Sequence, residues 1–218
     1  MPLSAVVDND VLIKGACYSL LAELMAAYGG AGSLGVLGTA RYVVPRRLLR
    51  DPRLVNRDQA VARWGTFFVD AEEVEPTPKA IDLATALEEA AAAAGVPLDV
   101  GESLLCAVAI DRPVPGVVTG DKRAIEALEL LLAGVNELRS LTGRVLCLEQ
   151  LIEALIPRLG AGVTRAAVCA EPCADRALSL CFQCGRRSDG RIDPEGLRSY
   201  IGDLRRRAPT ILALRPPF

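Results

Sequence analysis

Aspartates follow a short apolar run near the start of the chain. The segment AVVDNDVLI places Asp8 and Asp10 directly after small apolar residues that are typical of a buried strand. Further along, Asp99 and Glu102 stand at the start of an expected helix, and Asp121 directly follows the run GVVTG. A buried carboxylate without a partner costs free energy. A divalent metal ion, a phosphoryl group or a solvated turn would each explain these positions.

The residue types narrow the chemistry that such acids could perform. Oxygen ligands without nitrogen or sulfur favour Mg²⁺ or Mn²⁺, which can activate water and stabilise an in-line phosphoryl displacement. The chain contains no histidine, which excludes histidine general bases, histidine-containing catalytic triads and histidine-bound metals. Carboxylates crowded into one crevice repel one another, so we expect at least one to have a raised pKa without metal.

The elements that must position these acids alternate along the chain. Strands are predicted at 4–8, 34–44 and 116–120, and helices at 11–28, after Pro45, and at 56–68, 77–95, 97–112 and 122–134, with a last strand and helix within 143–160. This alternation predicts an α/β protein, a three-layer α/β/α sandwich with a parallel sheet of four or five strands. Sites in such sheets form outside the carboxyl ends of the strands, where the strand order reverses. We therefore expect the acids to converge in one crevice.

Composition and charge set limits on the class of protein. The chain has 218 residues, of which 51% are hydrophobic, and a formal net charge of −2. This is enough apolar material for a sizeable core, and it argues against disorder. The apolar runs are broken before the roughly 20 residues that a membrane span requires, and MPLSAVVDND lacks the basic start of a signal peptide. We therefore expect a cytoplasmic protein without a membrane partner.

Three segments in order resemble the PIN-domain nucleases. They are VVDNDVLI, LDVGESLLCAVA and VVTGDKRAIEAL, and the resemblance covers roughly residues 3–160. It implies a PIN-like nuclease domain over 1–160 that hydrolyses RNA as a metal-dependent endoribonuclease. The toxin of a toxin–antitoxin pair is one form that such an enzyme takes. The implied Mg²⁺ or Mn²⁺ ligands are Asp8, Glu102 and Asp121. The resemblance further implies RNA as substrate, and an antitoxin, another protein or a second copy of the chain as candidate partners.

Other residues of these motifs would support the metal ligands. Asp10 and Asp99 would assist directly or through water, and Thr119 would orient Asp121 or a bound water. The family usually carries a glutamate on the helix after the second strand, whereas this chain has VVPRRLLRDPRL there, with Arg46 and Arg47 near the expected place. A catalytically degenerate PIN-like scaffold is therefore an alternative function.

A second alternative comes from another enzyme class. VVDNDVLI also resembles the nucleophile motif of haloacid-dehalogenase-like phosphatases, in which Asp8 would be the nucleophile and Asp10 the acid/base. That family separates its later threonine, lysine and acidic residues, whereas TGDK compresses Thr119, Asp121 and Lys122 into one short segment. The phosphatase hypothesis therefore ranks below both PIN-like hypotheses.

Residues 161–218 are predicted to form a helical extension rich in cysteine and arginine. The segment CAEPCADRALSLCFQCG contains four cysteines that could close a tetrahedral zinc site, although packing within helices is an alternative; they are Cys169, Cys173, Cys181 and Cys184. A helix starting at Asp193 should pack on the domain through one apolar stripe, formed by Leu197, Ile201 and Leu204.

Cations near the acids could hold a nucleic-acid backbone. Phosphate contacts from Lys and Arg supply much of the affinity in such complexes. Arg46 and Arg47 after the second strand, and Lys122 beside Asp121, are the candidate nucleic-acid-binding residues. Aromatic residues are not interleaved with them, so no base stacking is predicted.

Overall fold

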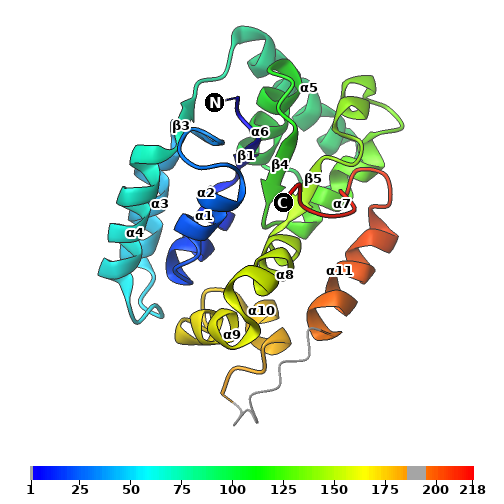
Figure 1. Cartoon of the computed structure of the whole chain (residues 1–218). Helices are drawn as coiled ribbons and strands as arrows, with labels where there is room; N and C mark the ends of the chain where they lie inside the picture. Colours follow the sequence, from blue (N-terminus) through cyan, green and yellow to red (C-terminus); the bar gives the residue numbers. More distant parts are fainter. Residues whose placement is uncertain (1, 186–194) are drawn as a thin grey trace.

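A sheet of five parallel strands lies at the centre of the chain in the computed structural model, which describes residues 2–185 and 195–218 (Figure 1). The strand order is β3-β2-β1-β4-β5. The strands are β1 (Ala5–Val7), β2 (Leu34–Leu37), β3 (Glu72–Val74), β4 (Gly116–Thr119) and β5 (Val145–Cys147). The direction of the strand order reverses at β1, so the crevice expected for an open parallel sheet lies between the carboxyl ends of β1 and its neighbours.

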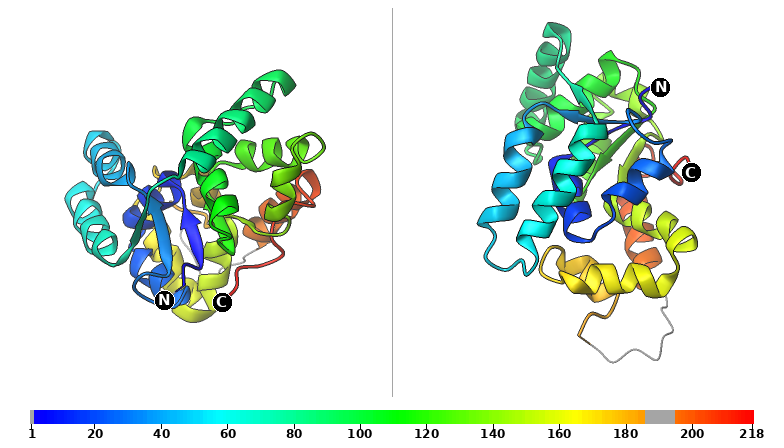
Figure 2. Two further views of the ribbon diagram at one scale, coloured as in Figure 1. Left: turned by 90° about the horizontal axis from the view of Figure 1, so that it is seen from above. Right: turned by 60° about the vertical axis from the view of Figure 1, so that its left-hand side comes forward.

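Helices cover both faces of this sheet, which confirms the α/β class and the predicted three-layer architecture. They are α1 (Asn9–Cys17), α2 (Leu21–Ala27), α3 (Ala40–Arg50), α4 (Arg57–Asp70), α5 (Pro78–Ala94), α6 (Val100–Asp111), α7 (Lys122–Leu131), the 3-10 helix η1 (Asn136–Leu141), α8 (Leu148–Leu159), α9 (Ala161–Ala170), α10 (Arg176–Cys181) and α11 (Glu195–Arg207). The views in Figure 2 show α5 and α6 on one side of the sheet and α2 and α8 on the other. Within the described parts of the chain, no helix is both long and apolar enough to cross a membrane.

Local signals in the sequence account for the clearest helix boundaries. Thr77 is the N-cap of α5, and its Oγ1 accepts the N–H of Ala80 at 3.1 Å. Gly95 ends the same helix in the left-handed conformation, with a φ of 66°. A side-chain cap of this kind contributes about 1 kcal/mol, and it depends only on neighbouring residues. Both ends of α5 are therefore confirmed.

The first predicted helix, 11–28, is wrong as a single element. The structure divides it into α1 and α2 at Ser19, which has a left-handed φ of 59°. The N–H of Leu20 donates to the carbonyl of Gly15 at 2.9 Å, as at many helix ends with a left-handed residue. That position usually holds glycine, so a serine there gave no stop signal in the sequence.

The predicted strand at 34–44 is too long, and the predicted helix after Pro45 begins too late. The strand β2 ends at Leu37, and α3 already begins at Ala40, so that Pro45 lies inside the helix. Val43 and Val44 favour a strand by propensity, but packing of α3 against α1 and α4 outweighs that preference. The strand β3 was not predicted, because its three residues, Glu72–Val74, form no apolar run.

The C-terminal segment packs on the sheet and on its helices. As predicted, α11 buries one apolar stripe, since Leu197, Ile201 and Leu204 are at most 4% exposed. The predicted helix start at Asp193 lies outside the described residues. The edge of β5 is covered as well, because Ala213 donates its N–H to the carbonyl of Val145 at 2.8 Å. The predicted domain boundary after residue 160 lies next to the end of α8 at Leu159. One hydrophobic core contains residues from both sides of it, so the division into two domains stays a prediction.

Candidate active site

An open cleft of about 1050 Å³ lies at the carboxyl ends of β1 and β4, where the strand order reverses. The register pairs Val7 with Val118, which places Asp8 level with Thr119. The N–H of Asp8 donates to the carbonyl of Val118 at 2.9 Å and holds the two strand ends together. All five acids singled out in the sequence line this cleft, namely Asp8, Asp10, Asp99, Glu102 and Asp121.

Helix capping holds these acids in place. Asp8 is the N-cap of α1, and its Oδ2 accepts the N–H of Asp10 at 3.2 Å. Asp99 and Glu102 form a capping box at the start of α6: Asp99 Oδ1 accepts the N–H of Glu102 at 3.0 Å, and Glu102 Oε2 accepts the N–H of Asp99 at 3.2 Å. Asp121 is the N-cap of α7, and its Oδ1 accepts the N–H of Arg123 at 2.8 Å. Three helix N-termini therefore direct partial positive charge toward the cleft.

Two carboxyl groups in the cleft hold their protons more strongly than usual. Burial raises the pKa of Asp8 to about 6, against the lowering effect of the hydrogen bond from the Asp10 N–H. Burial also raises the pKa of Glu102 to about 8, and the charges of Asp99, Asp121 and Asp8 add to this effect. The expectation of a raised carboxyl pKa is confirmed, although burial outweighs repulsion as its cause. Near pH 7 and without a cation, Glu102 is therefore mainly protonated.

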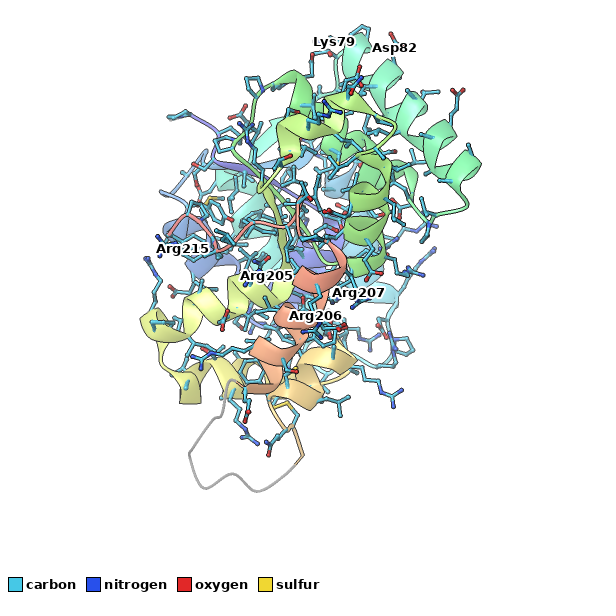
Figure 3. All side chains as sticks on the ribbon, turned by 90° about the vertical axis from the view of Figure 1, so that its right-hand side faces the viewer. Lys79, Asp82, Arg205, Arg206, Arg207 and Arg215 are labelled. Carbon is cyan, nitrogen blue, oxygen red and sulfur yellow. A yellow bond between two sulfur atoms is a disulfide. The ribbon has the colours of Figure 1, made fainter. Side chains whose placement is uncertain are left out.

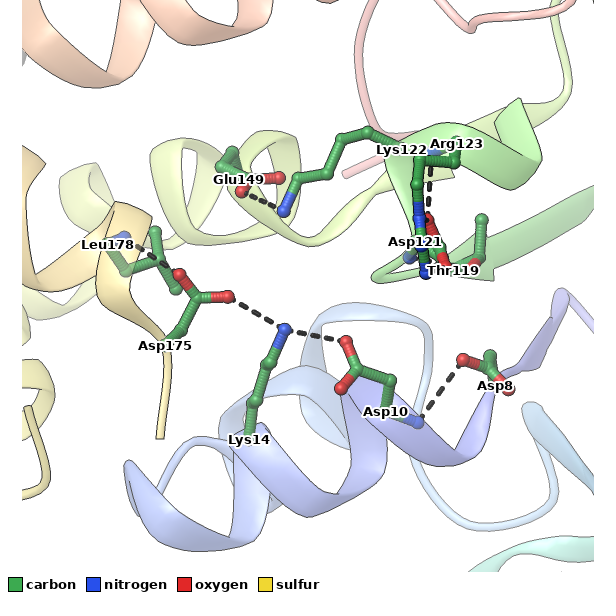
Figure 4. Close-up of polar contacts among 10 residues, drawn as sticks. All are labelled: Asp8, Asp10, Lys14, Thr119, Asp121, Lys122, Arg123, Glu149, Asp175 and Leu178. Carbon is green, nitrogen blue, oxygen red and sulfur yellow. Dashed lines mark hydrogen bonds and ion pairs between the residues drawn. The ribbon is translucent and has the colours of Figure 1, made fainter. Parts of the chain in front are cut away.

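Asp10 is paired with a half-buried lysine that no sequence motif singled out. Lys14 Nζ lies 2.6 Å from Asp10 Oδ2 and 2.7 Å from Asp175 Oδ2, as Figure 4 shows. Although burial lowers the pKa of Lys14, the charges of Asp10 and Asp175 raise it above its usual value. Asp175 comes from the C-terminal extension, where its Oδ1 also caps α10 by accepting the N–H of Leu178. The predicted direct role of Asp10 at a metal is therefore limited by its ion pair.

Gly120 leaves the space that Asp10 occupies. A Cβ at Gly120 would overlap Asp10 Oδ2 and come within 2.9 Å of Asp10 Cγ. Because Lys14 holds that carboxylate, we expect Gly120→Ala to lower the free energy of unfolding by roughly 1–3 kcal/mol.

The matched control is Gly65→Ala in α4, where an added Cβ meets nothing within 4 Å. Because alanine is the better helix former, this variant should equal or exceed the wild type, by up to about 1 kcal/mol. Urea unfolding of the three proteins makes the comparison. Equal effects of the two substitutions would contradict the proposed packing of Asp10 on Gly120.

Asp121 is paired with an exposed arginine. Arg123 Nη2 lies 2.8 Å from Asp121 Oδ2, and Arg123 Nε lies 3.3 Å from Oδ1. Burial raises the pKa of Asp121, but the hydrogen bonds and charge of Arg123 bring it below its usual value. The side chain of Arg123 is 76% exposed, so exchanging this contact for another ligand costs little. Thr119 Oγ1 accepts the N–H of Asp121 at 3.1 Å, a contact of the kind its predicted orienting role requires.

Lys122 is already paired within the protein, and its role in binding nucleic acid stays a prediction. Its Nζ lies 2.6 Å from Glu149 Oε1 on α8, and Glu149 is fully buried. The same ammonium group lies 5.4 Å from the centre of the Tyr200 ring on α11. The first turn of α7 faces these helices, so the charge of Lys122 is neutralised within the protein. Arg46 and Arg47 lie on the exposed surface of α3, and Arg47 lines the cleft.

The C-terminal extension supplies part of the cleft wall. Tyr200 and Arg207 of α11 both line it, and Figure 3 shows Arg205, Arg206 and Arg207 at the end of that helix. Arg207 forms ion pairs with Glu126 and with Asp203. The arginine run LRRRAP at the end of this helix is a basic segment of the kind expected to hold phosphates near the acids, whereas no motif indicated Tyr200.

The four cysteines of the extension do not form the predicted zinc site. Cys169 and Cys184 are joined by a disulfide, and Cys173 Sγ lies 2.9 Å from the carbonyl oxygen of Arg53. Across residues 2–185 and 195–218, no three His, Cys, Asp or Glu side chains are gathered as a metal-binding group. The cleft acids match Mg²⁺ or Mn²⁺ in donor chemistry and in charge, but Arg123 would have to leave Asp121 for them to act together.

Comparisons of the chain with models of protein families, with curated proteins and with solved structures found no match. A functional assignment therefore depends on the residues and the geometry of the cleft.

Proposed function

We propose that the protein hydrolyses RNA phosphodiester bonds as a metal-dependent ribonuclease of the PIN type. The observation that carries the proposal is the arrangement of acids from separate elements around one cleft at the reversal of strand order. Acids placed only to cap helices would not need to line one cleft, and capping does not account for the raised pKa of Glu102, which burial brings to about 8. A divalent cation would replace that proton, because carboxylate ligands must be ionised to bind.

Asp8, Glu102 and Asp121 would hold Mg²⁺ or Mn²⁺ in this proposal, and Asp99 would assist. The bound cation would supply an activated water and neutralise charge on the phosphoryl group. Arg123, once released from Asp121, would have a free guanidinium within the same cleft to pair with a phosphate oxygen. Lys14 would hold the Asp10 carboxylate in place against Gly120.

The catalytically degenerate scaffold is the second candidate. It is favoured by the ion pairs that already engage Asp10 and Asp121, and by arginines where the family usually has a glutamate. The phosphatase alternative gains no support, because Lys14 and Lys122 are both bound by carboxylates other than Asp8.

Thermal unfolding with and without Mn²⁺ or Mg²⁺ tests the proposal before the RNA target is known. A cation that binds only the folded state stabilises it by about 2.7 kcal/mol at a concentration of 100 times Kd. We expect Asp8→Asn to abolish this stabilisation and to lower cleavage of a mixed-sequence RNA by at least about 100-fold.

Asp82→Asn is the matched control, since Asp82 is exposed on α5 and does not line the cleft. It should respond to metal and cleave as the wild type does. If neither metal changes the melting temperature of the wild type, the nuclease proposal is rejected. A metal response without cleavage would instead support the scaffold.

A further inference from the structure

A second groove, of about 670 Å³, opens beside the acidic cleft. The two share Asp10, Lys14, Val43 and Arg47 in their linings, so they form one continuous depression. Four arginines of α3 and the loop that follows it line this second groove; they are Arg46, Arg47, Arg50 and Arg53. We call it the arginine groove.

Three of these arginines have no ion-pair partner among the described residues. Arg53 is paired with Asp51, its Nη2 lying 2.7 Å from Asp51 Oδ2. The side chains of Arg46, Arg47 and Arg50 form no hydrogen bond or ion pair with any residue in the described part of the chain. Exposed and unpaired guanidinium groups in one groove favour a ligand with several negative charges, and phosphate oxygens match their geometry.

Apolar side chains lie between these charges. Ile13, Val43, Leu54 and Ala174 contribute to the lining, so the groove also offers a surface to a flat apolar group. An acidic peptide would pair with the arginines, but its acidic side chains would place no flat apolar group against this surface. A nucleotide would use both, because its phosphate is anionic and its base has an apolar face.

The C-terminal extension holds the far wall of the groove in place. Glu171 accepts the N–H of Val55 at 3.0 Å and the side-chain N–H of Asn56 at 2.9 Å. Cys173 Sγ contacts the carbonyl of Arg53 at 2.9 Å. These contacts fix the loop between α3 and α4, so the groove is a built feature rather than a gap between loose segments.

We propose that the arginine groove binds the nucleotide next to the scissile phosphate, with its phosphates on Arg46, Arg47 and Arg50 and its base unpaired on the apolar lining. This inference rests on the proposed function and deepens it. A base in a duplex is stacked and paired, so it would have to leave its partner to reach Ile13 or Leu54. The groove therefore selects RNA that is single-stranded beside the cut.

Binding of a short fluorescent single-stranded RNA, measured by anisotropy in EDTA, tests the groove without cleavage. We expect Arg46→Ala and Arg50→Ala each to weaken binding about 3- to 10-fold. Each should also reduce the slope of log K against log salt by about 0.7, the value for one lost contact to a single strand. The duplex of the same sequence should bind at least about 10-fold more weakly than the single strand.

Arg139→Ala is the matched control, because Arg139 is exposed on η1 and lines neither groove nor cleft. It should bind RNA as the wild type does, with an unchanged salt slope. The inference would be overturned if Arg50→Ala bound RNA as tightly as the wild type, or if the duplex and the single strand bound equally tightly. A labelled poly-glutamate that binds as tightly as RNA and loses binding in Arg50→Ala would assign the groove to an acidic peptide instead.

Cleavage with Mn²⁺, measured in parallel, separates this inference from the proposed function. If the arginine variants bind RNA as the wild type does and the protein still cleaves RNA, the groove proposal is rejected and the nuclease proposal is not. Groove-dependent binding of single strands without cleavage supports the groove and rejects the nuclease.

Discussion

Replacing Glu102 with glutamine is expected to stabilise the metal-free protein at pH 8 by roughly 4 kcal/mol. Burial raises the pKa of this carboxyl from its ordinary value of 4.5 to about 8, so the folded protein holds a proton that the unfolded chain has released. The wild type is therefore most stable below pH 4.5 with respect to this group, and it loses that stability as the pH rises toward 8. Glutamine does not titrate, so it removes the loss.

Glutamine also preserves the local structure at this position. Its side-chain oxygen can accept the N–H of Asp99 as Glu102 does, so the capping box of α6 is retained. Urea unfolding in EDTA at pH 5 and pH 8 measures the effect, and Glu89→Gln on the exposed surface of α5 is the control. That control should follow the wild-type pH profile. A wild-type stability that does not change between these pH values would contradict the prediction.

Replacing Lys14 with methionine is expected to lower the free energy of unfolding by roughly 3–5 kcal/mol, because two partly buried carboxylates lose the charge between them. Lys14 is only 12% exposed and lies within 2.7 Å of both Asp10 and Asp175. Unfolding by urea at pH 7 gives the measurement.

Lys79→Met supplies the comparison for this substitution. Lys79 is 81% exposed and lies 3.4 Å from Asp111, so removing its charge should change stability by less than about 1 kcal/mol. Combining Lys14→Met with Asp10→Asn and Asp175→Asn should recover much of the loss, because the buried charges are then removed together. If Lys14→Met costs no more than Lys79→Met, the buried ion pairs do not stabilise the fold.

Features that depend only on neighbouring residues were predictable from the sequence. Apolar runs such as AVV and GVVT, alternating with helical periodicity, were sufficient for the α/β class and a parallel sheet. Thr77 and Gly95 set the ends of α5, and Asp99 with Glu102 formed a capping box from residues three apart. The presence of the five acids in the lining of one cleft also followed, because the carboxyl ends of parallel strands share one edge of the sheet.

Several of the charge pairs depend on how distant helices pack. Asp175 reaches Lys14, Glu149 takes the charge of Lys122, and Tyr200 and Arg207 arrive at the cleft from α11. The i, i+4 spacing of Asp10 and Lys14 was a local signal for one of these contacts, but the remaining partners are far apart in the chain. Local sequence sets backbone conformation, whereas the direction of a long side chain depends on the helices packed beside it. For that reason the positions of the acids were predictable, whereas the distant partners Asp175, Glu149 and Arg207 were not.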